Sequence, residues 1–195
     1  DTSQFPVVTV YVSVTDANGE PVPVSPNQIV IMENGEEMAI DNVGGADDIG
    51  PLTTLLVIDI SGSMNHGGKL KAAQQAAQAY VDQARTSDQI GLVTFNTEIK
   101  YEQPITSDRR KMIQAIKGLQ AEEDTAMYDA LAEGIDILEA VDGRKAVIVM
   151  TDGLDNRSKM SAQQVLQLIG PQGLSISVIG LGDPTHSTGA LTSLD

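Results

Sequence analysis

The fold is decided by the stretch Leu55-Leu56-Val57-Ile58-Asp59-Ile60-Ser61-Gly62-Ser63-Met64. Its first four residues form a continuous apolar run, which is typical of a strand covered on both faces of a parallel sheet. Polar residues follow at once, so they should lie at the carboxyl end of that strand. Ligands of open α/β sheets bind at this end. The stretch therefore predicts a buried strand and a candidate site directly after it.

Outward from this strand, apolar patterns of period two and of helical period alternate along the chain. Ser161 and Gln164 form a capping box that predicts one helix start, and Pro104 should end a short edge strand at 98–101. The alternation predicts an α/β fold: a doubly wound, mostly parallel sheet flanked by helices. The other expected strands are 90–95, 146–150 and 176–181, and the other expected helices are 70–84, 108–119 and 127–138.

The residues before this region have a different pattern. Residues 6–43 alternate in the manner of β-strands, with strands expected near 8–15 and 28–33 and a hairpin turn at Asn34-Gly35. So few strands make a poor independent domain. We therefore predict a β-sandwich-like segment at 1–43 that is incomplete by itself, a linker at 44–51 and the α/β domain at 52–195.

Composition excludes several classes of function. The 195 residues carry 27 Asp and Glu against 12 Lys and Arg, a net charge of −15. This charge disfavours binding to nucleic acid or to an anionic membrane surface. The absence of cysteine excludes disulfides, zinc–thiolate sites and thiol catalysis. The sequence has no apolar run long enough to span a membrane, and no signal segment is present in it.

A second polar segment follows another buried strand. Thr151-Asp152-Gly153 comes directly after the apolar run 146–150, so Asp152 should meet Asp59, Ser61 and Ser63 at one edge of the sheet. Carboxylate and hydroxyl oxygens are hard ligands, of the kind that Mg²⁺, Mn²⁺ or Ca²⁺ takes. The sequence therefore predicts a divalent-cation site at this edge.

Together these motifs resemble the von Willebrand factor A-type (VWA) domain with its metal-ion-dependent adhesion site. The resemblance covers residues 52 to about 183 and includes the segment Thr125-Ala126-Met127-Tyr128-Asp129-Ala130-Leu131. It implies that the serines and the threonine contact the cation directly or by switching, whereas the aspartates act largely through water. It also implies that residues 6–43 correspond to a β-sandwich segment found in some bacterial members. The implied metal residues are Asp59, Ser61, Ser63, Thr125 and Asp152.

The sequence departs from the family pattern in two places. Glu122-Glu123-Asp124 precedes Thr125 where the family often has glycines, and these acids could enrich cations, occupy an open coordination position or simply be solvated. The family usually continues beyond the position of Asp195 with a last strand and helix, so we expect a truncated C-terminal end. The strand-end serines could instead cap the following helix. Asp155 and Asn156 are expected to be polar loop residues rather than ligands.

Two classes of function follow. The first is a non-enzymatic protein-binding module for adhesion or assembly, because the family resemblance implies a partner's Glu or Asp carboxylate on the cation. The alternatives are a metal-dependent hydrolase or phosphatase-like enzyme, for which Asp155 or Glu123 would be the base, and a purely structural domain. A phosphotransferase of the haloacid dehalogenase type would need an aspartate where Ser61 stands. An extracellular, cell-surface or periplasmic location in a bacterium is expected.

Overall fold

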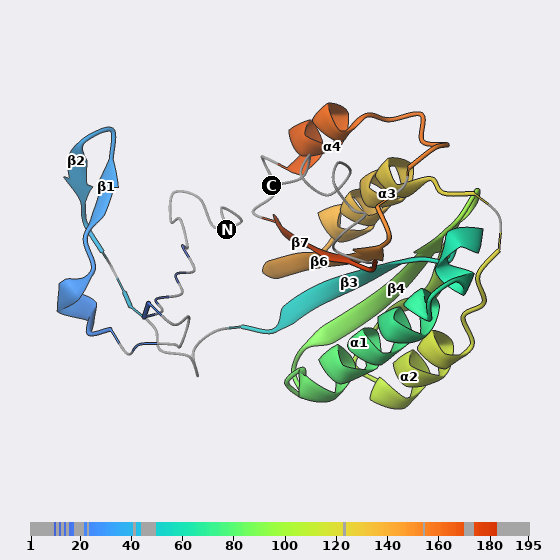
Figure 1. Ribbon diagram of the computed structural model, residues 1–195. Coiled ribbons are helices and arrows are strands. Elements are labelled where there is room, and N and C mark those ends of the chain that lie inside the picture. Colours follow the sequence, from blue (N-terminus) through green and yellow to red (C-terminus); the bar gives the residue numbers. More distant parts are fainter. Residues whose placement is uncertain are drawn as a thin grey trace. The chain divides into compact units, whose positions relative to one another are not determined.

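A computed structural model of the chain describes residues 10, 12, 14, 16–17, 22, 24–40, 42–43, 50–122, 124–153, 155–169 and 174–182. The chain divides into two compact units, residues 1–50 and 51–195. The larger unit is a twisted sheet with helices on both faces (Figure 1).

The smaller unit contains a two-stranded antiparallel hairpin. Strands β1 (Ile31–Glu33) and β2 (Glu36–Met38) pair around the turn Asn34-Gly35. Both turn residues have positive φ angles, 52° and 87°, as a type I′ turn requires, so the predicted hairpin is confirmed. The prediction of a strand from residue 28 was wrong, because the 3₁₀ turn η1 (Pro26–Gln28) precedes β1.

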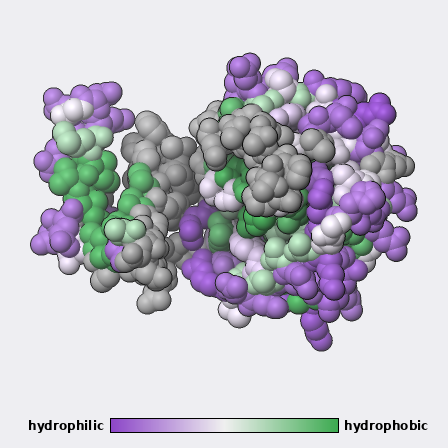
Figure 2. Space-filling model, viewed as in Figure 1, coloured by the Kyte–Doolittle hydropathy of each residue, from purple (hydrophilic) through white to green (hydrophobic). Residues whose placement is uncertain are grey.

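Apolar side chains are exposed in this smaller unit. Figure 2 shows them gathered around the hairpin, where Val30 and Met32 are each more than half exposed. In the strand predicted near residue 8, the described residues Val10, Val12 and Val14 are exposed and belong to no strand. The other residues of that prediction lie outside the described ones. The β-sandwich therefore stays a prediction.

The sheet of the larger unit has the strand order β5-β4-β3-β6-β7. All of its neighbouring strands run parallel except β5, which pairs antiparallel with β4 at one edge. The predicted doubly wound, mostly parallel sheet is confirmed. Its strands are β3 (Leu52–Asp59), β4 (Gln89–Phe95), β5 (Ile99–Thr106), β6 (Arg144–Thr151) and β7 (Leu174–Gly180).

Helices cover the two faces of the sheet. On one face lie α1 (Lys69–Gln83) and α2 (Arg109–Lys117), and on the other lie α3 (Met127–Glu139) and α4 (Ala162–Ile169) (Figure 1). All four predicted helices are present. No helix among the described residues is both long enough and apolar enough to cross a membrane.

The central position of β3 in the sheet explains its apolar sequence. Leu55 and Val57 pack in the core on the α3 side, whereas Leu56 and Ile58 pack in the core on the α1 side. All four side chains are fully buried. A strand that is covered on both faces needs apolar residues at every position, so the run has no polar alternation.

Strand β5 differs from the prediction. It continues through Pro104 to Thr106, although Pro104 was expected to end it. β5 is an edge strand, and its pairing with β4 shifts register on both sides of Leu92. Proline has no N–H to donate and is tolerated at such edges and irregularities. The backbone N–H of Ile105 donates instead to the Tyr101 hydroxyl at 2.9 Å.

The order of the strands determines where a site can form. The chain runs from β3 to β4 on one side and reaches β6 on the other side of β3. The connections that leave β3 and β6 therefore diverge at the carboxyl ends of these two strands. Such a switch point opens a crevice in α/β sheets. Asp59 ends β3, and the 3₁₀ turn η3 (Gly62–Asn65) follows it.

Candidate functional site

The two predicted carboxylates follow neighbouring strands. β3 and β6 are paired in parallel, with Ile58 opposite Met150. Asp59 is the next residue of β3, and Asp152 comes one residue after the last residue of β6, Thr151. The structure therefore brings both aspartates to the switch point, as the sequence predicts.

Asp59 is completely buried and accepts two hydrogen bonds. The Ser61 backbone N–H donates to its Oδ1 at 2.8 Å, and the Thr151 hydroxyl donates to its Oδ2 at 2.7 Å. Burial raises the pKa of Asp59, the hydrogen bonds from Ser61 and Thr151 oppose this effect, and the nearby charge of Asp152 adds to it. The Asp59 carboxylate is therefore a buried charge next to a like charge, which a cation would stabilise.

The two predicted serines face each other. Their Oγ atoms lie 3.1 Å apart. Ser61 occupies the N-cap position of η3, but its side chain makes no capping hydrogen bond, and the N-cap of α1 is Gly68. The capping alternative therefore does not account for Ser61. Its hydroxyl is directed to Ser63, next to the Asp59 carboxylate that its own N–H holds.

Asp152 forms an ion pair that the sequence analysis missed. Lys69 Nζ donates to Asp152 Oδ2 at 2.8 Å, and the side chain of Asp152 is only 2% exposed. The other oxygen, Oδ1, is buried and has no hydrogen-bond partner. A buried carboxylate oxygen without a partner is costly, so this atom is suited to a ligand. Nothing in the sequence marked Lys69, because 83 residues separate it from its partner.

Thr125 is buried, and hydrogen bonds of its backbone N–H and carbonyl hold it in place. Its N–H donates to Asn156 Oδ1 at 3.2 Å, and its carbonyl accepts the N–H groups of Asn156 and Arg157. The next residue, Ala126, donates its N–H to the carbonyl of Asn96 at 2.9 Å. Because Asn96 directly follows β4, these bonds place Thr125 at the same edge of the sheet as Asp59.

Asp155 organises the loop beside Thr125. Its Oδ2 accepts the Tyr128 N–H at 3.0 Å and the Ser158 hydroxyl at 2.6 Å. Its Oδ1 accepts the N–H groups of Arg157 and Ser158. These contacts agree with the expected polar loop role. The spacing of an aspartate three residues before a serine is typical of such local side-chain-to-backbone bonding, and could have indicated this role.

The acidic residues before Thr125 have different surroundings. The Glu122 backbone N–H donates to the Ile60 carbonyl at 2.7 Å, which ties this loop to the end of β3. Asp124 forms an ion pair with Arg157 at 2.6 Å. Glu123 lies outside the described residues. The charge of Asp124 is therefore already paired.

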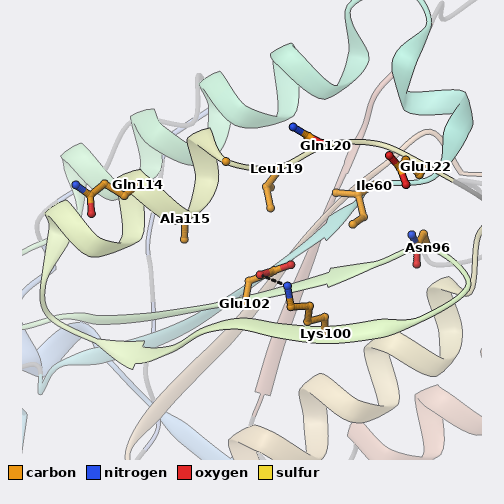
Figure 3. Close-up of a pocket in the computed structure, with 10 residues that line it drawn as sticks. Ile60, Asn96, Lys100, Glu102, Gln114, Ala115, Leu119, Gln120 and Glu122 are labelled. Atoms are coloured by element: carbon orange, nitrogen blue, oxygen red, sulfur yellow. Dashed lines mark ion pairs between the residues drawn. The ribbon is translucent and has the colours of Figure 1, made fainter.

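A pocket of about 470 Å³ lies beside these residues. Figure 3 shows Ile60 and Leu119 directed into it above Lys100 and Glu102 of β5, with Asn96 and Glu122 at one end. Lys100 and Glu102 form an ion pair at 2.9 Å. Because Ile60 directly follows Asp59, the pocket is adjacent to the candidate metal residues.

The donor set consists of two carboxylates and three hydroxyls. Within the described part of the chain, no group of three or more His, Cys, Asp or Glu side chains could hold a metal ion. A cation at the switch point would therefore depend on Ser and Thr hydroxyls as well as on the aspartates. An all-oxygen set with an unpartnered carboxylate oxygen fits a hard divalent cation.

The family model of the von Willebrand factor type A domain matches residues 54–154, which include most of β3, all of β4, β5 and β6, and all five candidate residues. The chain belongs to this family. An uncharacterized protein of Borreliella burgdorferi is 29% identical over 140 residues, which cover 66% of this chain and 39% of that protein. The match thus spans about two fifths of the relative's length.

Solved structures share the fold. The three N-terminal domains of the type V pili tip protein Mfa5 from Porphyromonas gingivalis are 26% identical, with a TM-score of 0.51 over 58% of this chain and 22% of that chain. Proximal thread matrix protein 1 from the mussel byssus has a zinc-occupied metal-ion-dependent adhesion site (MIDAS) motif. It is 22% identical, with a TM-score of 0.61 over 68% of this chain and 36% of that chain. The central sheet and its helices are therefore those of a VWA domain.

Proposed function

We propose that this domain is a divalent-cation-dependent protein-binding module for adhesion or assembly. The observation that carries the proposal is the pair of hydroxyls of Ser61 and Ser63, which lie 3.1 Å apart beside the buried Asp59 carboxylate, with no capping bond from Ser61. In the proposal these two hydroxyls, with Thr125, contact the cation. Asp59 and Asp152 act largely through water.

The electrostatics of the site support a cation. Asp59 and Asp152 repel each other, and burial adds to the cost of charging Asp59. A divalent cation would offset this cost. Because hydroxyls are neutral and the aspartates act through water, the cation keeps much of its positive charge and attracts an anionic ligand. The proposed ligand is a Glu or Asp carboxylate of a partner protein.

Mg²⁺, Mn²⁺ and Ca²⁺ are the proposed cations. All three are hard ions that prefer oxygen ligands. A mussel protein of the same fold has a zinc-occupied MIDAS motif, which supports the binding of a divalent cation by this domain.

A binding role is favoured over an enzymatic one by the surroundings of Asp155. Both of its carboxylate oxygens accept hydrogen bonds, from Arg157 and Ser158 of its own loop and from the Tyr128 N–H at the start of α3. A general base must be able to reach a water molecule or substrate. Asp155 is therefore poorly suited to the role that a hydrolase would give it, and we propose no catalytic residue.

An assembly role at a bacterial surface is the proposed context. A pili tip protein carries a domain of this fold, which supports an extracellular or cell-surface setting. The pocket beside Ile60 gives a partner a second place of contact next to the cation. Its lining combines the apolar Ile60 and Leu119 with the charged Lys100, Glu102 and Glu122.

The experiment that tests the proposal follows water bound to Mn²⁺. Protein with Mn²⁺ should enhance the relaxation rate of solvent protons, because an open coordination position exchanges water. Added acetate should reduce the enhancement by replacing that water, whereas acetamide, its neutral counterpart, should not. Asp59→Ala should remove the enhancement. Equal effects of acetate and acetamide would contradict carboxylate binding, and undiminished enhancement in Asp59→Ala would contradict the site.

A further inference from the structure

We propose that Lys69 is an internal counter-ion that holds Asp152 when the site has no divalent cation and competes with the cation for that carboxylate. The inference rests on the proposed function, because it concerns the same site. It assigns to Lys69 the part of a positioning residue that weakens cation binding. Neither the sequence pattern nor the resemblance assigned a role to this residue.

The geometry of the ion pair carries the inference. Lys69 Nζ lies 2.8 Å from Asp152 Oδ2, and the Asp152 side chain is almost completely buried. Oδ1 of the same carboxylate is buried without a hydrogen-bond partner. Lys69 thus neutralises the charge of Asp152 but leaves one of its two carboxylate oxygens without a hydrogen bond. That oxygen could accept a ligand other than the lysine.

The position of Lys69 on its helix is a second, independent observation. It is the first residue of α1, a helix of 15 residues with no acidic residue in its first turn. The N-terminal end of a helix carries a partial positive charge, which disfavours a cation there. Lys69 is therefore in an unfavourable place for helix stability. The attraction of Asp152 accounts for the direction of its side chain.

The surroundings of the pair make the competition physically reasonable. Asp59 adds a second negative charge close to Asp152, so a site without a cation gains from the ammonium group. A divalent cation near both aspartates would repel that group. The Lys69 side chain is 27% exposed, and its flexible stem can move the charge into water. Binding of the cation then includes the cost of breaking the ion pair.

Three variants test this account by calorimetric titration of Mn²⁺ and by thermal unfolding with chelator. Lys69→Met removes the charge and keeps the stem, Lys69→Arg keeps the charge, and Lys71→Met removes an exposed charge from the same turn. We expect Lys69→Met to bind Mn²⁺ about tenfold more tightly. Its thermal midpoint in chelator should fall by about 2–4 °C, because the buried Asp152 carboxylate loses its counter-ion. The other two variants should resemble the wild type.

The outcomes separate this inference from the proposed function. Mn²⁺ affinity that is unchanged or weaker in Lys69→Met, with binding by the wild type intact, would overturn the inference and leave the metal site standing. Equal tightening in Lys71→Met would also overturn it, because the effect would then be one of net charge. Absence of Mn²⁺ binding by the wild type and by all three variants would overturn the proposed function together with the inference.

Discussion

The hydroxyl of Thr151 donates a hydrogen bond to Asp59 Oδ2 at 2.7 Å and so joins the ends of β6 and β3. The same hydroxyl accepts the Gly153 N–H at 3.1 Å, which shapes the turn that contains Asp152. One side chain thus fixes the orientation of the first aspartate and the path of the chain around the second. The candidate site is organised before any ligand is added.

The charge of Asp59 should make the metal-free fold less stable at neutral pH than at acid pH. Because its pKa is raised in the folded state, the folded chain binds more protons than the unfolded chain, where the pKa of Asp has its ordinary value of 3.8. The contribution of Asp59 to the free energy of unfolding is therefore fully present below about pH 3.8 and is lost as pH rises through the raised pKa of the folded state.

Asp59→Asn removes this dependence. We expect the variant to be more stable than the wild type at pH 7 in chelator, with the difference shrinking as pH falls towards 4. Urea unfolding of both proteins across this range measures the difference. A variant that is less stable than the wild type by the same amount at every pH would contradict the raised pKa.

A divalent cation should stabilise the fold. Binding only to the folded state adds about 2.7 kcal/mol at 100 times the dissociation constant, which corresponds to about 5–10 °C for a chain of this size. This rise in the thermal unfolding midpoint should disappear in Asp59→Ala. It should persist in Glu122→Gln, because Glu122 lines the neighbouring pocket. Thermal scans in chelator, in millimolar Mg²⁺ and in monovalent salt of equal ionic strength separate binding from screening of the −15 charge.

Asp88 should contribute to stability with the opposite pH dependence. Burial would raise its pKa, but hydrogen bonds from Arg85 and from the Leu52 N–H outweigh burial and lower it. Its contribution is therefore present above about pH 4 and is lost as pH falls through the lowered pKa. Asp88→Asn should cost about 1–3 kcal/mol at pH 7, and Asp82→Asn, an exposed change on α1, should cost little. Equal urea midpoints for the two variants at pH 7 would contradict this account.

A side chain at Gly91 should destabilise the fold. A Cβ at this position would lie 2.8 Å from Leu55 Cδ1, 3.1 Å from Ile105 Cγ1 and 3.3 Å from the Tyr101 hydroxyl. Gly91→Ala should therefore lower the free energy of unfolding by about 1–3 kcal/mol. Gly118→Ala is the matched control, because its nearest neighbour would be 3.5 Å away. A Gly91→Ala chain as stable as the control would show that β4 and β5 are packed more loosely.

Much of the fold follows from the sequence for a physical reason. A strand covered on both faces must be apolar throughout, so Leu55 to Ile58 could be placed without any other information. The parallel arrangement then brings Asp59 and Asp152 to one edge. The edge position of β5 was expected, but Pro104 misled the prediction of where the strand ends, because a proline at a sheet edge breaks no ladder hydrogen bond.

Contacts that depend on tertiary structure could not be predicted. The bond between Lys69 and Asp152 joins a helix start to a strand end across 83 residues, and no local pattern marks it. The Tyr128 N–H donates to Asp155 and the Thr125 N–H donates to Asn156, so these bonds join the loop after β6 to the start of α3 and to the residues just before it. Such polar contacts depend on how the fold brings these segments together. The spacing of apolar residues along the sequence indicates only where strands and helices form.

The most direct measurement of the central claim is anomalous X-ray diffraction from a crystal soaked with Mn²⁺ and acetate. We predict one Mn²⁺ peak at the carboxyl ends of β3 and β6, in contact with the hydroxyls of Ser61 and Ser63, with an acetate oxygen as a further ligand. We also predict that the Lys69 ammonium group leaves Asp152 in that crystal. A well-diffracting soaked crystal with no Mn²⁺ peak among Asp59, Ser61, Ser63, Thr125 and Asp152 would contradict the proposed site.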